Sequence, residues 1–218
     1  DYQENPTPIP CPKGVSVLLI IGQSNAANYG ESRASSDAAN FYNGRCYKAR
    51  DPLLGASGDR GSMWTRMRFG GVIAPIAIGG SRMAEWAPGG RHFPRLAIAL
   101  RNLRRANLGP THIAIIQGEY EGNTNGDPEA YSRNAKALVS YLQLTGAKIY
   151  MARTSRCADV PNDAIRAAQA SSGARPGPDI DAIPGRINGC HLDDAGLAEA
   201  GRQWTLLFAR EVSNGVRP

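Results

Sequence analysis

Four short apolar runs recur along the chain, and each has the length of a buried β-strand. The runs are rich in Leu and β-branched residues and are nearly continuous, a pattern typical of parallel strands covered on both faces. They cover residues 15–21, 72–78, 113–116 and 147–152. Pro75 interrupts the second run, so we expect that strand at a sheet edge or beside a β-bulge.

Helical patterns lie between and after these runs. Residues 93–106 place apolar side chains on one stripe, and Pro128 opens a second helix that ends before Gly146. A last helix begins at Asp193 or Asp194 and continues to about residue 212. The residues of this helix that we expect to face inward are Leu197, Ala200, Trp204, Leu207 and Phe208.

Strands that alternate with helices predict a parallel sheet with helices on both faces. We therefore expect one α/β domain over residues 1–218, a three-layer α/β/α sandwich around a mostly parallel sheet. Residues 29–71 fit poorly because Gly, Ser, Asp and Arg are frequent there. We expect an elaborated loop region in this segment, with one short strand near residues 45–49; long connections are often functional. Residues 1–12 include four prolines and indicate an extended lead-in.

Composition excludes several classes of protein. Of 218 residues, 42% are hydrophobic and 20% charged, as in a folded globular chain, and no apolar run approaches the ~18 residues of a membrane span. The net charge of +6 is scattered, and only Arg101, Arg104 and Arg105 cluster, in a pattern typical of a solvated helix face. Without a basic run that contains aromatic residues, we expect no nucleic-acid partner. Phosphate-binding glycine motifs are absent too, so we expect no nucleotide cofactor.

The four cysteines are Cys11, Cys46, Cys157 and Cys190. They are far apart and show no ligand spacing with the histidines, so we expect no metal. An even number of widely spaced cysteines favours two disulfides and a secreted or periplasmic protein. Four buried free thiols in a cytosolic enzyme are the alternative.

Polar residues follow each predicted strand, and ligands bind at the carboxyl ends of strands in open α/β sheets. Ser24 lies in the segment Gly22-Gln-Ser-Asn25, at a turn from strand to helix. A nucleophile at such a turn exposes its hydroxyl, and its own N–H group faces the developing oxyanion. A serine in this position also often caps a helix, and the motif alone supports both interpretations equally.

A serine nucleophile needs a base, usually a histidine. His191 lies in a loop just before the last helix and is the candidate. His112 begins a predicted strand, at the wrong end of the sheet, and favours a structural role. His92 follows the second strand and is expected in a surface loop.

Several sequence blocks resemble the SGNH hydrolase superfamily, specifically the sialate O-acetylesterase-like domain of carbohydrate esterase family 6. The blocks are GQSN at 22–25, AIGGSRMAEW at 77–86, QGE at 117–119 and HL followed by Gly at 191–196. They span nearly the whole chain in the family's order. The resemblance implies the flavodoxin-like SGNH fold and a serine esterase that removes O-acetyl groups from a carbohydrate of sialic acid, xylan or peptidoglycan type. It implies no cofactor.

The resemblance also implies a role for each matched residue. Ser24 attacks the ester carbonyl, and His191 takes its proton and returns it to the leaving sugar oxygen. The oxyanion is held by the backbone N–H groups of Ser24 and Gly80 and by the side-chain amide of Gln117. Glu119 is a buried brace for the site loops. A monomer with an acetylated carbohydrate as its substrate is expected, and an acetyltransferase that uses a sugar hydroxyl is an alternative.

One position departs from the family pattern, because Asn188 stands where an aspartate is expected three residues before His191. An Asn oxygen can accept the Nδ1–H of the histidine and fix its tautomer, as in Cys-His-Asn enzymes. Alternatively, another carboxylate supplies the charge, or the domain is a catalytically weakened carbohydrate-binding protein. The candidate carboxylates are Asp179, Asp181, Asp193 and Glu119.

The predicted fold also indicates how the cysteines pair, and it favours Cys157–Cys190 and Cys11–Cys46. Cys157 follows the fourth strand and Cys190 adjoins His191, so both are expected at the carboxyl ends of the strands. Cys11 precedes the first strand, at the opposite end, and we expect it to pair with Cys46. Polar and aromatic residues near the strand ends are expected to bind substrate, with Tyr and Trp stacking on sugar rings and Arg binding a carboxylate. These residues are Tyr29, Arg82, Trp86, Arg91 and Arg156. A rim or packing position is the alternative for each of them, and for Trp86 a position in the core.

Overall fold

A seven-stranded sheet forms the centre of the computed structural model, which describes residues 6–157 and 162–215. The strand order is β3-β2-β4-β1-β5-β6-β7, and all neighbouring pairs are parallel except β2–β3. This arrangement confirms the predicted mostly parallel sheet. The strands are β1 Val17–Gly22, β2 Ser35–Tyr42, β3 Arg45–Arg50, β4 Val72–Pro75, β5 His112–Ile116, β6 Lys148–Arg153 and β7 Arg175–Asp179.

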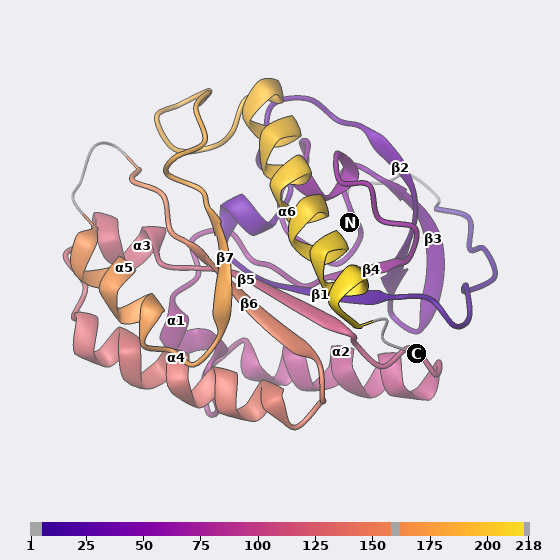
Figure 1. Ribbon diagram of the computed structural model, residues 1–218, viewed down its shortest axis with the longest axis horizontal. Helices are drawn as coiled ribbons and strands as arrows, with labels where there is room; N and C mark the ends of the chain where they lie inside the picture. Colours follow the sequence, from indigo (N-terminus) through magenta and orange to yellow (C-terminus); the bar gives the residue numbers. More distant parts are fainter. Residues whose placement is uncertain (1–5, 158–161, 216–218) are drawn as a thin grey trace.

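Helices cover both faces of the sheet, which gives three layers (Figure 1). The long helices α2 and α4 lie side by side below the sheet in this view, and α6 crosses the opposite face. The helices on the first face are α1 Met83–Trp86, α2 Phe93–Arg105, α3 Glu119–Asn123, α4 Pro128–Gln143 and α5 Asp163–Ala170. The other face carries α6 Asp194–Gly215 and the short 3-10 helices η1 Ser24–Ala26 and η2 Met63–Thr65.

Two hydrophobic cores result, one on each face, and β1 contributes to both. Leu19 and Ile21 pack with α2 and α4, whereas Leu18 and Ile20 pack with α6. Burial on both faces explains why this run is continuously apolar. Trp204 of α6 is fully buried in the second core, as predicted.

One sequence expectation about the strands is wrong, and a second is incomplete. Pro75 does not mark an edge, because β4 lies between β2 and β1 and Pro75 is its last residue. The short strand expected near residues 45–49 is present as β3, but residues 29–71 also contain β2, which forms an antiparallel hairpin with β3, and η2. The polar start of β2, Ser-Ser-Asp at 35–37, gives little strand signal. Pairing with β3 and β4 fixes this segment as a strand instead.

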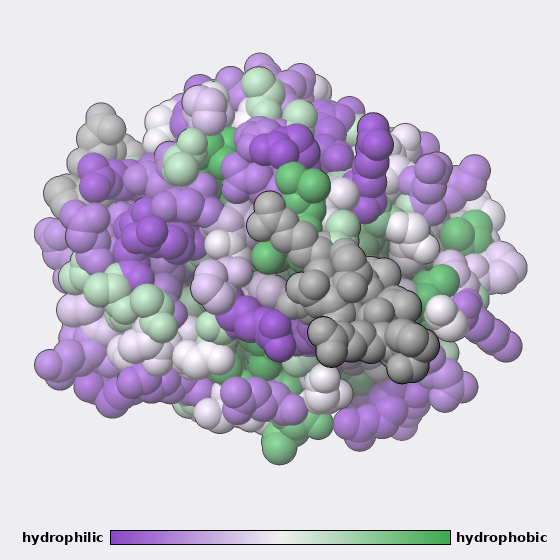
Figure 2. Space-filling model, in the orientation of Figure 1, coloured by the Kyte–Doolittle hydropathy of each residue, from purple (hydrophilic) through white to green (hydrophobic). Residues whose placement is uncertain are grey.

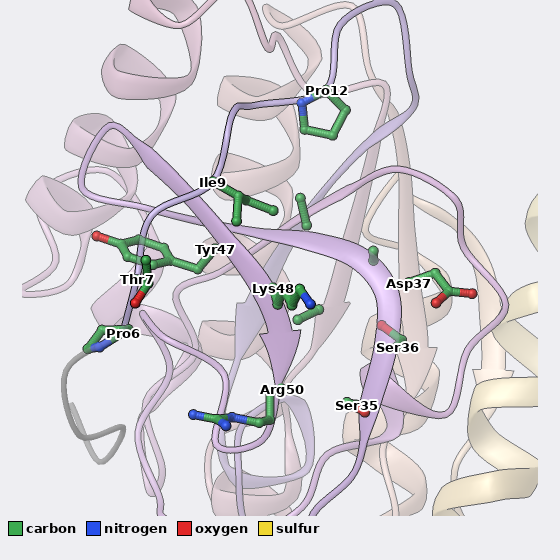
Figure 3. Close-up of a pocket in the computed structure, with 13 residues that line it drawn as sticks. Pro6, Thr7, Ile9, Pro12, Ser35, Ser36, Asp37, Tyr47, Lys48 and Arg50 are labelled. Carbon is green, nitrogen blue, oxygen red and sulfur yellow. The ribbon is translucent and has the colours of Figure 1, made fainter.

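The described part of the lead-in, residues 6–12, lies beside this hairpin. Ile9 N donates a hydrogen bond to Cys46 O (2.8 Å), and a Cys11–Cys46 disulfide joins the two segments. The lead-in, β2 and β3 together line a pocket of about 750 Å³ (Figure 3). This pocket is at the edge of the sheet, away from β1, β5 and β6.

Hydrophilic side chains predominate on the face shown in Figure 2, and hydrophobic ones are scattered over it. The large hydrophobic residues exposed in the described chain are Ile98, Leu144 and Leu206. Arg101, Arg104 and Arg105 are exposed on α2, as expected of a solvated face. Within the described residues, every helix is too short or too polar to cross a membrane.

Candidate active site

Ser24 is the first residue of η1, directly beyond the carboxyl end of β1. The chain is tight here: Gly22 has φ +140°, and a Cβ atom on it would meet Ile116 O of β5 at 1.9 Å. Gln23 occupies the N-cap position, so Ser24 is not the helix cap that the motif alone allowed. Ser24 is 8% exposed, and its hydroxyl has no hydrogen-bond partner within the described chain.

Asn25 fixes the turn that carries Ser24. Its Nδ2 donates to Glu119 Oε1 (3.0 Å) and to Ser155 Oγ (3.3 Å), which ties the end of β1 to the ends of β5 and β6. Glu119 is 1% exposed, and this burial raises the pKa of its carboxyl group. Glu119 therefore lies beneath the site, where it can brace the loops but cannot contact a substrate.

Gln117 is fully buried and bonded to its neighbours. Its Nε2 donates to Ser81 O (2.7 Å), to Gln23 Oε1 (3.1 Å) and to Glu121 Oε2 (3.3 Å). Both amide hydrogens therefore have internal acceptors, unlike those of an oxyanion donor. These hydrogen bonds favour a bracing role, in which Gln117 holds the turn at Gly80 against the end of β1, over the expected role as an oxyanion donor.

The backbone N–H groups of Ser24 and Gly80 lie at the strand ends and have no acceptor among the described residues. Gly80 has φ +69° and is exposed, and a Cβ atom on it would point into open space. This left-handed conformation favours glycine. Backbone donors of this kind are suited to an oxyanion.

The loop that carries His191 is held against the same strand ends. A disulfide links Cys190 to Cys157, just beyond β6, with a Cα–Cα distance of 4.3 Å. The ring of Tyr29, five residues after Ser24, stacks on the imidazole with centroids 5.4 Å apart. The structure thus places both Ser24 and the His191 loop beyond the carboxyl ends of the strands. Both expected disulfide pairs are present.

The imidazole of His191 contacts Asn188. Nδ2 of Asn188 lies 2.9 Å from His191 Nδ1, and Oδ1 of Asn188 accepts the backbone N–H groups of His191 (2.9 Å) and Cys190 (3.3 Å). Burial, followed by the cations Arg60 and Arg186, lowers the pKa of His191. The ring is therefore neutral near pH 7. Its Nε2 makes no hydrogen bond to Ser24 or to another described residue.

The four carboxylates considered as replacements for the missing aspartate have other partners. None of these contacts involves His191, so the structure gives no support to a displaced acid. The partners are the Arg166 side chain for Asp179 (2.6 Å), Arg156 N for Asp181 (2.9 Å), Gly196 N for Asp193 (2.8 Å) and Asn25 for Glu119 (3.0 Å).

Trp86 is not a substrate-binding residue. It is fully buried in the core, and its Nε1 donates to Ser81 Oγ (2.9 Å). The structure therefore selects the core position, which was the alternative for Trp86, because an aromatic residue near a strand end fits either role in the sequence. Tyr29 is half-buried against His191, where it supports the imidazole.

The three arginines expected at the site are exposed, and each already has a side-chain partner. Arg82 donates to the Tyr120 hydroxyl and lies over its ring, and the other two form ion pairs. The ion pairs are Arg91–Glu85 (2.9 Å), Arg156–Asp163 (3.4 Å) and Arg156–Asp181 (3.7 Å).

Sequence reasoning missed the cations beside His191. Arg186 is half-buried and donates to the backbone oxygens of Ile180 (2.6 Å) and Gly185 (3.3 Å). Arg60 is exposed and precedes Gly61, which pairs with Gly30 beside Tyr29. No motif marked these positions. Arg60 approaches His191 because the long segment after η1 folds back over the site, whereas Arg186 belongs to the His191 loop and pairs with Leu192.

Of the other two histidines, His112 has the structural position expected, whereas the side chain of His92 is largely buried and not in an exposed surface loop. His112 is the first residue of β5 and packs against Phe208 of α6, with ring centroids 4.9 Å apart. His92 precedes α2 and packs on Trp86, with centroids 5.1 Å apart.

Comparison with solved structures places the fold among known ones. A protein of Arabidopsis thaliana is 17% identical, with a TM-score of 0.74 over 90% of this chain and 98% of that one. The psychrotrophic esterase EstA from Pseudoalteromonas sp., inhibited by monoethylphosphonate, is 12% identical, with a TM-score of 0.57 over 91% and 99%. The chain shares the three-layer α/β fold of these two proteins, which confirms the expected sandwich around a mostly parallel sheet. No family model and no curated protein sequence matches the chain.

Proposed function

We propose that this protein is a serine carboxylic ester hydrolase of the SGNH superfamily. The observation that carries the proposal is the stacking of Tyr29 on His191, which holds a neutral imidazole at the same sheet edge as Ser24. A nucleophile and a base at the carboxyl ends of parallel strands are the two groups that acyl transfer requires. The shared fold with EstA, an esterase, supports this choice.

In the proposed reaction, Ser24 Oγ attacks the ester carbonyl and its proton passes to His191 Nε2. The carbonyl oxygen becomes an oxyanion, which accepts hydrogen bonds from the N–H groups of Ser24 and Gly80. The leaving alcohol takes the proton from His191 and departs, leaving an acyl group on Ser24. Water then attacks this ester with His191 as base, and the acid is released. Each oxyanion donor contributes about 3–4 kcal/mol, or 10²–10³ in rate.

The substrate class that the resemblance favours is an O-acetylated carbohydrate, and disulfides fit a secreted or periplasmic protein. Acetate release from a panel of acetylated glycans, by the wild type and by Ser24→Ala, tests this class directly. Release that requires Ser24 supports the proposal, and Ser24-dependent cleavage of aryl acetates without any glycan cleavage contradicts the substrate class. Addition of free sugar distinguishes the acetyltransferase, which would form a new sugar acetate.

A carbohydrate-binding protein with weak hydrolysis is the second candidate. The observation that favours it is the contact of Asn188 Nδ2 with His191 Nδ1, where an aspartate oxygen would be expected. Glycan binding that is unchanged in Ser24→Ala, together with no hydrolysis above the Ser24→Ala background, supports this candidate.

A further inference from the structure

The orientation of the Asn188 side-chain amide is fixed by the backbone of its own loop. Oδ1 faces two N–H donors, those of His191 (2.9 Å) and Cys190 (3.3 Å). The reverse orientation would place the NH₂ group against both donors and would lose both hydrogen bonds. The observed orientation is therefore the one that the hydrogen-bond network selects.

Nδ2 of Asn188 consequently faces Nδ1 of His191, at 2.9 Å. An amide NH₂ group donates and does not accept, so Nδ1 must accept this bond. A neutral imidazole carries one proton, which then resides on Nε2. This is the opposite of the tautomer expected from the sequence, in which the Asn oxygen accepts Nδ1–H.

We propose that Asn188 is a positioning residue that holds neutral His191 in the Nε2–H tautomer. This tautomer slows proton transfer from Ser24 to His191. The tautomer follows from the hydrogen bonds alone. Only its effect on rate rests on the proposed function.

The effect on rate follows from the proton transfer. Nε2 can take the Ser24 proton only after its own proton has moved to Nδ1, which breaks the bond from Asn188. The imidazolium that then forms would direct Nδ1–H at the NH₂ group of Asn188, beside the cations Arg60 and Arg186. Both steps raise the barrier. Replacement of Asp by Asn in the Ser-His-Asp triad of a protease lowers kcat by about 10⁴, because the histidine then adopts the wrong tautomer.

Asn188→Asp should reverse the tautomer of His191, and the side chain at position 188 hardly changes in size. One carboxylate oxygen still accepts hydrogen bonds from the backbone N–H groups of Cys190 and His191, and the other accepts the Nδ1–H of His191. Nε2 is then unprotonated and faces Ser24 as a base, and the imidazolium gains a counter-charge. Asn43→Asp is the matched control, because Asn43 begins the exposed β2–β3 turn with φ +47° and Asp suits such a turn equally.

Nitrogen-15 NMR of the imidazole side chains reads the tautomer without any substrate, with the His191 signals assigned by comparison with His191→Gln. We expect Nε2–H in the wild type and in Asn43→Asp, and Nδ1–H in Asn188→Asp. We also expect kcat for an aryl acetate to rise about 10–10⁴-fold in Asn188→Asp, with KM little changed. Nδ1–H in the wild type, or the same tautomer in both proteins, would overturn the proposal.

The two proposals fail in different ways. If the tautomer changes as expected but neither protein shows Ser24-dependent turnover, the assignment of Asn188 stands and the esterase function is wrong. If Ser24-dependent turnover is fast in the wild type and is not increased in Asn188→Asp, the esterase function stands and the proposed effect of the tautomer on the rate is wrong.

Discussion

The ring of Tyr29 stacks on the imidazole of His191 at a centroid distance of 5.4 Å, with an interplanar angle of 26°. This contact joins the segment that follows the serine to the loop that carries the base. The two segments are far apart in sequence, so the packing of one ring on the other holds the His191 loop against the segment that follows Ser24. The Tyr29 hydroxyl makes only a long bond to Ser57 Oγ (3.4 Å), and the ring therefore matters more than the hydroxyl.

Removal of this ring should slow hydrolysis. We expect Tyr29→Ala to lower kcat by about 2–10-fold, because an aromatic pair contributes about 0.5–1.5 kcal/mol of contact energy. Tyr29→Phe keeps the ring and should retain nearly full activity. Steady-state kinetics with an aryl acetate, beside thermal unfolding, checks both variants. Equal kcat in Tyr29→Ala and the wild type would show that the stack does not position the base.

The two disulfides offer a matched pair of variants, because they close loops of similar length, with sequence separations of 33 and 35. Loss of either should lower the free energy of unfolding by about 3–4 kcal/mol in the chain-entropy model. Only Cys157→Ser with Cys190→Ser should also lower kcat, because only that pair anchors the His191 loop.

Kinetics and chemical denaturation of the two double variants measure these effects. The variant with Cys11→Ser and Cys46→Ser serves as the control and should keep its kcat. A fall in kcat of the same size in both would mean that general loosening, rather than the position of His191, is responsible.

The pH dependence should follow the lowered pKa of His191. Burial, Arg60 and Arg186 all disfavour the protonated ring, so hydrolysis should persist below the ordinary histidine value of 6.5 before it falls with acid. Arg60→Gln removes one cation, raises the pKa and should move the acid limb to higher pH. Arg101→Gln, on the exposed face of α2, is the control. The dependence of kcat/KM on pH is measured for the wild type, Arg60→Gln and Arg101→Gln. An acid limb at the same pH in Arg60→Gln as in the wild type would refute the role of Arg60.

Replacement of Gln117 separates a brace from an oxyanion donor. Gln117→Ala leaves Ser81 O and Gln23 Oε1 without their donor in a buried position, so we expect the free energy of unfolding to fall by about 1–3 kcal/mol. An oxyanion donor would instead lower kcat by about 10²–10³ and leave stability nearly unchanged. Urea unfolding and kinetics on the same samples distinguish the two roles.

The elements that the sequence predicted are those whose pattern is local. β1 is continuously apolar because it is buried on both faces, and α6 shows its inward stripe clearly. β2 begins with Ser-Ser-Asp and becomes a strand through its pairing with β3 and β4, which the local pattern does not contain. Pro75 suggested an edge, yet a proline at the last position of an inner strand is tolerated.

The site shows the same division. The positions of Ser24 and His191, the proposed nucleophile and base, could be predicted from their motifs, because each motif lies at a strand end or before a helix. The orientation of the Asn188 amide could not, because the backbone N–H groups of its folded loop determine it. The sequence left two roles open for Trp86, because a Trp near a strand end can face either the core or the solvent, and the structure places it in the core. Arg60 reaches the site only through the tertiary path of the long segment after η1.

The most direct test of the account is the hydrolysis of an aryl acetate by Asn188→Asp, compared with the same variant that also carries Ser24→Ala. The account predicts turnover that depends wholly on Ser24, with an acetyl group trapped on that residue and detected by peptide mass mapping after rapid acid quench. Turnover that survives Ser24→Ala, or an acetyl group found on another residue, would contradict it.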